Sequence, residues 1–409
     1  MRVLLSAYGS RGDVEPLAGL AVRLRALGAQ ARVCAPPDEE FAELLAGVGV
    51  ELVPLGQPVR SFMHGATPPS AAELTRLRIA MVAEQFDTVA AAAEGCHVLV
   101  AAGLAQVAAR SVAERLGIRY VYASYHPVSL PSPHHPPAPR QGWPPPPEGA
   151  GNRTLWDLDA QGITELFGHA LNTRRASLDL PPVDNVRDHV FTDEPWLATD
   201  PVLGPWREPA DLDVVQTGAW ILPDERPLPA RLMAFLEAGS PPVYVGFGSM
   251  RAPEGIARAA VEAIRARGRR AVVSRGWADL AVLDDRDDCL VVGEVNQQAL
   301  FGRVAAVVHH GGAGTTATAA RAGAPQVVVP QMVDQPYWAG RVAALGIGAA
   351  HDGPTPTAAS LSAALTTALA PGTRDRARAV AGTIRTDGAE VAAKLLFDTA
   401  ARGGPPGPA

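Results

Sequence analysis

Short apolar runs alternate with longer, alanine-rich amphipathic stretches along most of this 409-residue chain. The first run, VLLSA at residues 3–7, is followed by a glycine-containing turn and by helical periodicity over residues 15–27. The runs have the length of buried strands, and the amphipathic stretches have the length of the helices that connect parallel strands. The pattern therefore predicts an α/β protein with mainly parallel sheets, and the chain length fits two domains.

Two strand openings resemble each other. VLLSAYGS begins at Val3 and VYVGFGS begins at Val243, and each leads to a helix that ends in Arg-Ala-x-Gly. Two doubly wound halves would show such a repeat. Ligands bind at the carboxyl ends of the strands in these sheets, so we expect a ligand in a cleft between the turns that contain Ser10 and Ser249.

The stretch VVHHGGAGTT at residues 307–316 is the most distinctive in the chain. An apolar strand ends in His309 and His310, a turn with three glycines follows, and two threonines open an alanine-rich helix. The free N–H groups of such a helix N-terminus favour a phosphate. The alternative is that the glycines only shape a tight turn and that neighbouring residues satisfy the histidines.

Two aspartates follow strand-like runs. Asp13 lies in the turn before the first helix, and Asp334 lies in PQMVDQP after the run at residues 326–330. Asp is a good helix N-cap at either position. Asp13 is also placed to act as a general base, and Asp334 with Gln335 offers acceptor oxygens and an amide to a polyhydroxylated ring. From these residues alone, capping and chemistry both remain open.

Two long segments of the first half lack strand or helix periodicity, namely residues 55–70 and the proline-rich residues 130–149. Loops of that length in a compact domain are usually functional or disordered. We expect the proline-rich segment to be a surface flap, although it also resembles ligands of proline-reading domains. His134 and Trp143 give this flap aromatic surface, and His126 lies at the carboxyl edge of the strand before it.

A D-x-D pattern, Asp285-Arg286-Asp287, superficially matches motifs that bind a divalent metal together with a nucleotide sugar. Its neighbours are charged and no apolar strand residues flank it closely. We therefore expect a solvated turn and no metal site.

Charge and cysteine content exclude several classes of protein. The net charge is −6 and the arginines are scattered, which argues against nucleic acid as a partner. No apolar run is long enough to span a bilayer, and the chain enters a strand directly, without a signal peptide. Cys34, Cys96 and Cys289 are widely separated, as in a reducing compartment. We expect a cytoplasmic protein with no membrane partner.

Several motifs spread from residue 1 to about residue 396 are typical of one enzyme family. They read GSRGD, VQTGAWILPDERPL, VYVGFGS, SRGWADL, EVNQQALF, HHGGAGTT, PQMVDQP and AGRVAALGIGAAHDGPTPT. Together they resemble the vancomycin-type glycosyltransferases, which glycosylate heptapeptide antibiotic aglycones. The resemblance is nearest to the aglycone glucosyltransferase branch, partly through PSPHHPPAP. It implies a GT-B fold, with two Rossmann-like doubly wound domains that face a cleft.

The resemblance also implies how the chain is divided. Residues 1–200 would form the acceptor-binding domain, residues 201–242 a connection, and residues 243–372 the nucleotide-sugar domain. Residues 373–409 would contain helices that pack back on the first domain, followed by a disordered tail.

The family's chemistry is an inverting, metal-independent transfer that needs no cofactor. By resemblance, Asp13 would be the general base, and the acceptor would contact His126, His134 and Trp143. The residues implied for donor binding are Ser10, Arg11, Ser249, Arg275, Trp277, Val295, His309, His310, Gly312, Ala313, Gly314, Thr315, Asp334 and Gln335. The expected partners are UDP-glucose as donor and a phenolic hydroxyl of a glycopeptide aglycone as acceptor, and the protein would be a monomer.

Three alternatives remain at this stage. In the first, the donor is UDP-N-acetylglucosamine or a TDP-deoxyaminosugar. In the second, the protein is a nucleotide-sugar epimerase of the same fold, which needs no aglycone. In the third, the protein binds a nucleotide sugar or an aglycone without catalysis.

Overall fold

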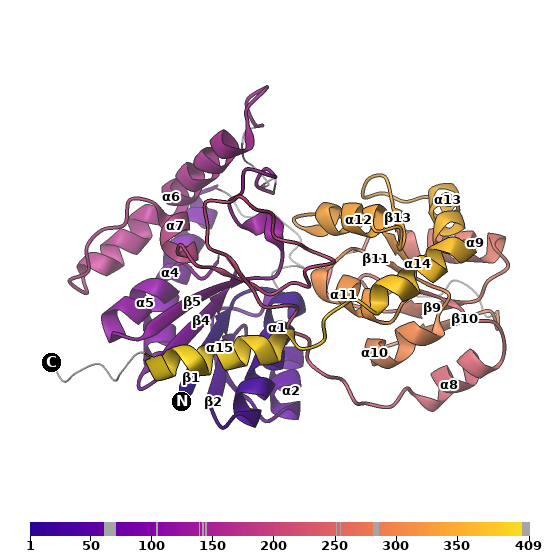
Figure 1. Cartoon of the computed structure of the whole chain (residues 1–409), viewed down its shortest axis with the longest axis horizontal. Coiled ribbons are helices and arrows are strands. Elements are labelled where there is room, and N and C mark those ends of the chain that lie inside the picture. Colours follow the sequence, from indigo (N-terminus) through magenta and orange to yellow (C-terminus); the bar gives the residue numbers. More distant parts are fainter. Residues whose placement is uncertain are drawn as a thin grey trace. The chain divides into compact units, whose positions relative to one another are not determined.

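A parallel sheet forms the centre of each of two structural units (Figure 1). The computed structural model describes residues 1–60, 71–103, 105–138, 140, 143, 145–250, 252–253, 255–280 and 286–402. Unit 1 contains Met1–Thr199, Pro205–Leu222 and the residues from Thr386 onward, and unit 2 contains Asp200–Gly204 and Pro223–Arg385.

Unit 1 has a seven-stranded sheet in the order β3-β2-β1-β4-β5-β6-β7. Its strands are β1 Arg2–Ala7, β2 Gln30–Ala35, β3 Glu51–Pro54, β4 Val98–Ala102, β5 Arg119–Ser124, β6 Trp196–Leu197 and β7 Val215–Gln216. Its helices are α1 Arg11–Ala26, α2 Glu39–Gly47, α4 Ala71–Ala93, α5 Ala109–Leu116, the 3₁₀ turn η1 Pro127–Ser129, α6 Asn152–Ala176, α7 Val186–Phe191 and α15 Gly388–Arg402. All strand pairs are parallel.

Unit 2 has a six-stranded parallel sheet in the order β10-β9-β8-β11-β12-β13. Its strands are β8 Val243–Gly246, β9 Ala271–Ser274, β10 Cys289–Val292, β11 Ala306–His309, β12 Gln326–Val328 and β13 Gly348–Ala350. Its helices are α8 Ala230–Glu237, α9 Ile256–Ala266, α10 Gln297–Leu300, the 3₁₀ turn η2 Phe301–Arg303, α11 Ala313–Arg321, α12 Gln335–Ala344, α13 Ala358–Ala368 and α14 Pro371–Ala381.

The apolar runs of the sequence form the buried centres of both sheets. Val3, Leu4 and Leu5 of β1 are at most 1% exposed. The valines of β8 and of β11 in unit 2 are fully buried. Helices cover both faces of such sheets, so a central strand has no polar face and its sequence does not alternate. The expectation of parallel α/β sheets is confirmed.

The repeat in the sequence has a structural counterpart. β1 and β8 each lie third in their sheets, where the strand order reverses between β1 and β4 and between β8 and β11. In doubly wound sheets, ligands bind outside the carboxyl ends of the strands at this switch point. The turns after β1, β4, β8 and β11 are therefore the places to look for a site.

The division of the chain differs from the expected one in two ways. Part of the expected connection, residues 205–222, belongs to unit 1, because β7 pairs with β6. The C-terminal helices belong to different units: α14 packs on α11 in unit 2, and α15 packs on α1 in unit 1 (Figure 1). Periodicity reveals that helices exist there but not which sheet they cover.

Parts of the sequence-based expectations fall outside the described residues. These are residues 61–70 of the first long loop, four residues of the proline-rich segment, Asp285 and the last seven residues of the tail. Within the part of the chain that the structure describes, no helix is long and apolar enough to cross a membrane.

Close backbone packing fixes the start of α15. A Cβ atom on Gly388 would lie 2.4 Å from the carbonyl carbon of Gly218 and 2.5 Å from the carbonyl oxygen of Ala219. Gly388→Ala should therefore destabilise the protein by about 1–3 kcal/mol, as overpacking of a closed interface does. Gly47→Ala is the control, because no atom lies within 4 Å of a Cβ there. Urea unfolding should show a lower midpoint for the first variant only. Equal midpoints would contradict the docking of α15.

Candidate functional site

Asp13 lies in the first turn of α1, at the carboxyl end of β1. The backbone N–H of Ser10 donates to Asp13 Oδ2 at 2.8 Å, and Ser10 Oγ lies 3.3 Å from the same oxygen. Ser10 is the N-cap and Asp13 is the third helical residue, so the pair forms a capping box. The helix begins at Arg11 rather than near Glu15, so Asp13 is not the N-cap, which was one of the two roles that the sequence left open.

The Asp13 carboxylate is held close to the switch point of the unit 1 sheet. A Cβ atom on Gly9 would lie 2.2 Å from Oδ2, so the backbone before the helix approaches the carboxylate as only glycine allows. On the neighbouring strand, Gly103 follows β4, and a Cβ there would lie 3.9 Å from Oδ1. The Tyr125 hydroxyl donates to the Asp13 backbone oxygen at 3.1 Å. Burial, and then the Asp13 charge, raise the pKa of Tyr125 well above its ordinary value, so this hydroxyl keeps its proton.

Ser10, Arg11 and His126 are the other site residues that the sequence predicts near Asp13. Ser10 is the N-cap, and Arg11 Nε lies 2.6 Å from Glu15 Oε2 on the next turn of α1. His126 follows Tyr125 directly, and its Nδ1 lies 3.0 Å from Ser129 Oγ.

His134 and Trp143 lie farther along the proline-rich segment. His134 is exposed, and its Nε2 lies 2.9 Å from the backbone oxygen of Pro209. Trp143 is half-buried, since its ring lies on α6 where a Cβ on Gly162 would come within 2.3 Å. Asn152 Nδ2 and Trp156 Nε1 of α6 also donate to backbone oxygens of the segment, at 2.8 Å and 2.9 Å. The described part of the segment thus lies at the surface, as its composition predicts, and is docked on α6.

In unit 2, the turn after β11 is built around His309. This ring is fully buried: the Gly311 N–H donates to Nδ1 at 3.1 Å, and Nε2 lies 2.9 Å from Gln326 Oε1. Because Nδ1 accepts, the proton lies on Nε2 and the ring is neutral. Burial first, and then His310, lower the pKa of His309 to about 3. His309 therefore shapes the turn, and neither of its nitrogens is left for a ligand.

His310 lies between the two turns of the unit 2 switch point. Cβ atoms on Gly248 and Gly312 would lie 3.3 Å from its Cε1 and 2.6 Å from its Nε2, so both glycines leave room for the ring. Its Nδ1 is buried and has no hydrogen-bond partner among the described residues. Burial lowers the pKa of His310 to about 4, and the charge of Asp334 opposes this shift. The ring is neutral near pH 7 and carries one unused polar nitrogen.

The N-terminus of α11 follows immediately. Gly312 is the N-cap with extended backbone, and the first intrahelical bond runs from the Thr316 N–H to the Gly312 oxygen at 3.0 Å. The N–H groups of Ala313, Gly314 and Thr315 consequently have no partner within the helix. Gly314 is exposed. Three backbone donors and the positive end of the helix dipole thus lie beside His310.

Asp334 occupies the N-cap position of α12, but its side chain does not cap the helix. Its Oδ2 accepts from Trp338 Nε1 at 2.7 Å. The neighbouring Gln335 Oε1 accepts from the backbone N–H groups of Gln331 and Met332, at 2.8 Å and 3.1 Å. Gln335 therefore holds the loop after β12, and Asp334 is tied to α12 through Oδ2, while its other oxygen has no hydrogen bond among the described residues.

The remaining donor-binding candidates line the turns after β8, β9 and β10. Ser249 is half-buried next to Gly248, and the Trp277 N–H donates to the Gly248 oxygen at 3.0 Å. Trp277 and Val295 are almost fully buried. Arg275 is exposed and its NH1 lies 3.4 Å from Asp279. Asp287 of the D-x-D pattern is exposed, and the described residues contain no group of three acidic, histidine or cysteine side chains that could hold a metal.

Two residues that hold His309 and Asp334 in place, Gln326 and Trp338, were not predicted from the sequence. Gln326 lies on β12, and strand pairing brings it to His309, a partner that no local spacing reveals. Trp338 lies four residues after Asp334 on one face of α12, so the helical i, i+4 spacing carried a usable signal.

Both buried histidines of unit 2 should make the protein sensitive to acid. Their folded pKa values, about 3 and about 4, lie below the ordinary value of 6.5, so the unfolded chain binds more protons between these limits. The contribution of the two neutral histidines to the free energy of unfolding is fully present above about pH 6.5, and it falls as the pH drops towards 4. His310→Phe should reduce that dependence by up to about 1.4 kcal/mol per pH unit. Urea midpoints between pH 4 and 8 test this, and an unchanged slope would contradict the burial of a neutral His310.

Family models match two parts of the chain. Residues 3–131 match the glycosyltransferase family 28 N-terminal domain, and residues 279–395 match the C-terminal domain of erythromycin biosynthesis protein CIII-like proteins. Among solved structures, the glycosyltransferase of kitacinnamycin has a TM-score of 0.72 at 20% identity and covers 97% of this chain and 98% of its own. Glycosyltransferase VinC in complex with dTDP has a TM-score of 0.69 at 20% identity, covering 98% and 100%. These likenesses confirm the GT-B fold.

Relatives from Amycolatopsis orientalis match over nearly the whole length. Glycosyltransferase GtfE is 61% identical over 97% of both chains, and the vancomycin aglycone glucosyltransferase is 57% identical over 98% of both. The dTDP-epi-vancosaminyltransferase is 55% identical over 97% of both. The protein is a glycosyltransferase, and the chain belongs to the vancomycin-type family of glycopeptide glycosyltransferases.

Proposed function

We propose that the protein transfers glucose from UDP-glucose to a phenolic hydroxyl of a heptapeptide glycopeptide aglycone, with inversion at the anomeric carbon. One observation carries this proposal. The unit 1 sheet has a carboxylate, Asp13, at its switch point, and the unit 2 sheet has a buried histidine and a helix N-terminus at the equivalent point. The first can accept a proton, and the second can hold a diphosphate.

Asp13 is the general base in this proposal. It removes the proton of the acceptor hydroxyl while the hydroxyl oxygen attacks the anomeric carbon of the sugar. A phenol loses its proton more readily than an alkanol, so a carboxylate suffices as base. The bonds from the Ser10 N–H and hydroxyl to one carboxylate oxygen fix the orientation of the side chain.

The leaving diphosphate is assigned to the N-terminus of α11. Negative charge grows on it as the glycosidic bond breaks through a transition state with oxocarbenium character. The N–H groups of residues 313–315 are fixed before the reaction, so they stabilise that charge without rearrangement. Between the two histidines, we assign diphosphate binding to His310, because its Nδ1 is unused, whereas both nitrogens of His309 are bonded within the turn.

The sugar and the base of the donor are assigned to the neighbouring loops of unit 2. Asp334, held by Trp338 through one oxygen, offers the other to a sugar hydroxyl, and Gln335 supports the same loop. The Trp277 side chain and the Val295 backbone are assigned to the nucleotide base, with Ser249 near the phosphates.

The similarity to known relatives does not decide which nucleotide sugar is the donor. The vancomycin aglycone glucosyltransferase and the dTDP-epi-vancosaminyltransferase are 57% and 55% identical to this chain. The chain should therefore be incubated with vancomycin aglycone and, separately, UDP-glucose, UDP-N-acetylglucosamine and a dTDP-deoxyaminosugar, and the products weighed by mass spectrometry. We expect a hexose to be added from UDP-glucose. Conversion of the donor without acceptor would indicate an epimerase, and binding without turnover would indicate a non-catalytic binder.

The role of Asp13 as a base can be separated from its role in the capping box. Asn keeps an acceptor oxygen for the Ser10 N–H but cannot take a proton. Asp13→Asn should therefore retain the stability and donor affinity of the wild type while kcat falls by about 10²–10⁴-fold. Asp87→Asn, which neutralises an exposed carboxylate of the same unit, is the control and should keep full activity. Normal turnover by Asp13→Asn would remove the assignment.

Metal should not be required. The proposed diphosphate donors are backbone N–H groups and a histidine, which are in place without an added cation. Exhaustive chelation should leave turnover unchanged, and Asp287→Ala should fold and bind donor normally. Activity that is lost to chelation and restored by manganese or magnesium would show that the diphosphate is stabilised differently.

A further inference from the structure

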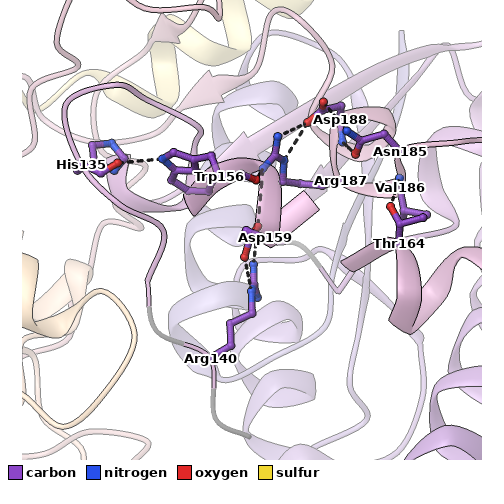
Figure 2. A network of polar contacts seen from close by, with 9 residues as sticks. All are labelled: His135, Arg140, Trp156, Asp159, Thr164, Asn185, Val186, Arg187 and Asp188. Carbon is purple, nitrogen blue, oxygen red and sulfur yellow. Dashed lines mark hydrogen bonds and ion pairs between the residues drawn. The ribbon is translucent and has the colours of Figure 1, made fainter. Parts of the chain in front are cut away.

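A buried carboxylate on α6 anchors the proline-rich segment. Asp159 is 3% exposed, and Arg140 of the segment donates to it from Nε at 2.6 Å and from NH2 at 3.4 Å. On the other side, Arg187 NH1 lies 4.0 Å from Asp159 Oδ2. Figure 2 shows the carboxylate between the two guanidinium groups.

A second line of contacts leads from the same network to the start of the segment. Arg187 donates to the Trp156 backbone oxygen and lies over the Trp156 ring, 5.6 Å from its centroid. The Trp156 Nε1–H donates in turn to the His135 backbone oxygen at 2.9 Å (Figure 2). Two residues of the segment, His135 and Arg140, are thus connected to Asp159 by separate routes.

The anchored residues carry the aromatic surface of the segment. The Arg140 guanidinium stacks on Trp143, 5.3 Å from the ring centroid. The backbone N–H of Trp143 donates to the backbone oxygen of Arg140 at 3.2 Å. His134 precedes His135 and is exposed. The segment is joined through η1 to Tyr125, which follows β5 and whose hydroxyl contacts Asp13, so the chain leaves the sheet at the edge where the proposed base lies.

Stability alone is a weak reason for such a network. Removing charges from water costs about as much as a buried ion pair returns, and apolar residues of similar volume often stabilise a protein better. In this network Arg140 is half-buried, and its directional pair with the buried Asp159 is the kind of contact that can fix one conformation. A binding segment that is already in its bound conformation binds more tightly, since no ordering is needed on association.

We propose that Asp159 is a positioning residue for acceptor recognition. Through Arg140 and Arg187 it holds the described residues of the proline-rich segment around His135 and Arg140 in one conformation, and this presents Trp143 and the neighbouring histidines to the aglycone. This inference rests on the proposed function, because it takes the segment to be part of the binding site for the glycopeptide acceptor.

Arg140→Met tests the proposal without leaving Asp159 isolated, because Arg187 remains beside the carboxylate. If the segment then populates its present conformation a tenth of the time, the KM for vancomycin aglycone should rise about tenfold, while kcat and the KM for UDP-glucose stay within about twofold. Arg140→Lys keeps the charge but loses the planar fork, and should give an intermediate value. Trp156→Phe removes the donor to His135 and keeps an aromatic ring beneath Arg187, so it should also raise the KM for the aglycone.

Arg153→Met is the matched control. Arg153 lies on α6, the helix of Asp159, and pairs with Asp211, and its side chain is 66% exposed. Among the described residues, no hydrogen bond or ion pair joins it to Arg140 or Asp159. It should behave as wild type. Hydrogen exchange of the amides in residues 130–138 should be faster in Arg140→Met and unchanged in Arg153→Met.

The failures are distinguishable. The positioning role would be overturned if Arg140→Met left the KM for the aglycone unchanged. It would also be overturned if the variant raised both KM values and lowered kcat by similar factors. Either result would leave the proposed function intact. A wild-type enzyme that neither glycosylates nor binds the aglycone by calorimetry would overturn the proposed function, and the positioning role with it.

Discussion

In both sheets every strand pair is parallel, so all strands of a sheet end at the same edge. This constraint decides where polar chemistry is possible. The strand interiors are buried on both faces and hold apolar residues, so charged and hydrogen-bonding side chains collect in the turns that follow the strands. The strand order reverses at β1/β4 and at β8/β11, and there neighbouring turns diverge and leave space. Asp13 lies after β1, and His310 lies after β11.

Glycine and buried polar contacts make these turns specific. His309 uses both ring nitrogens to hold its own turn, which leaves the next residue, His310, as the one with a spare nitrogen. Room for the His310 ring comes from Gly248 in the turn after β8 and Gly312 in the turn after β11. The capping box of α1 plays the corresponding part in unit 1, since it fixes the Asp13 carboxylate through the N–H of Ser10. In each unit, one residue carries the proposed chemistry and a residue of the same turn holds that turn in place.

The proline-rich segment shows how a sequence that cannot join a helix or strand can still have a defined structure. Its prolines remove backbone donors, so it contributes little to hydrogen bonding through its own N–H groups. Its anchors are instead supplied by α6 and α7, through Asn152, Trp156, Asp159 and Arg187. The segment and these helices are distant enough in sequence that no local rule connects them.

The sequence by itself determined the parallel α/β class, the two sheets and the motif at residues 307–316, because apolar runs, helical periodicity and glycine turns are local properties. Through its motifs it also indicated the enzyme family. Only the tertiary structure decided that Asp13 is the third residue of a capping box, that His309 faces inward, and that Asp334 is held by Trp338. It also assigned α14 and α15 to different units. Each of these depends on which side chains meet across strands, turns and helices, and that is set by packing between segments rather than by the spacing of residues along the chain.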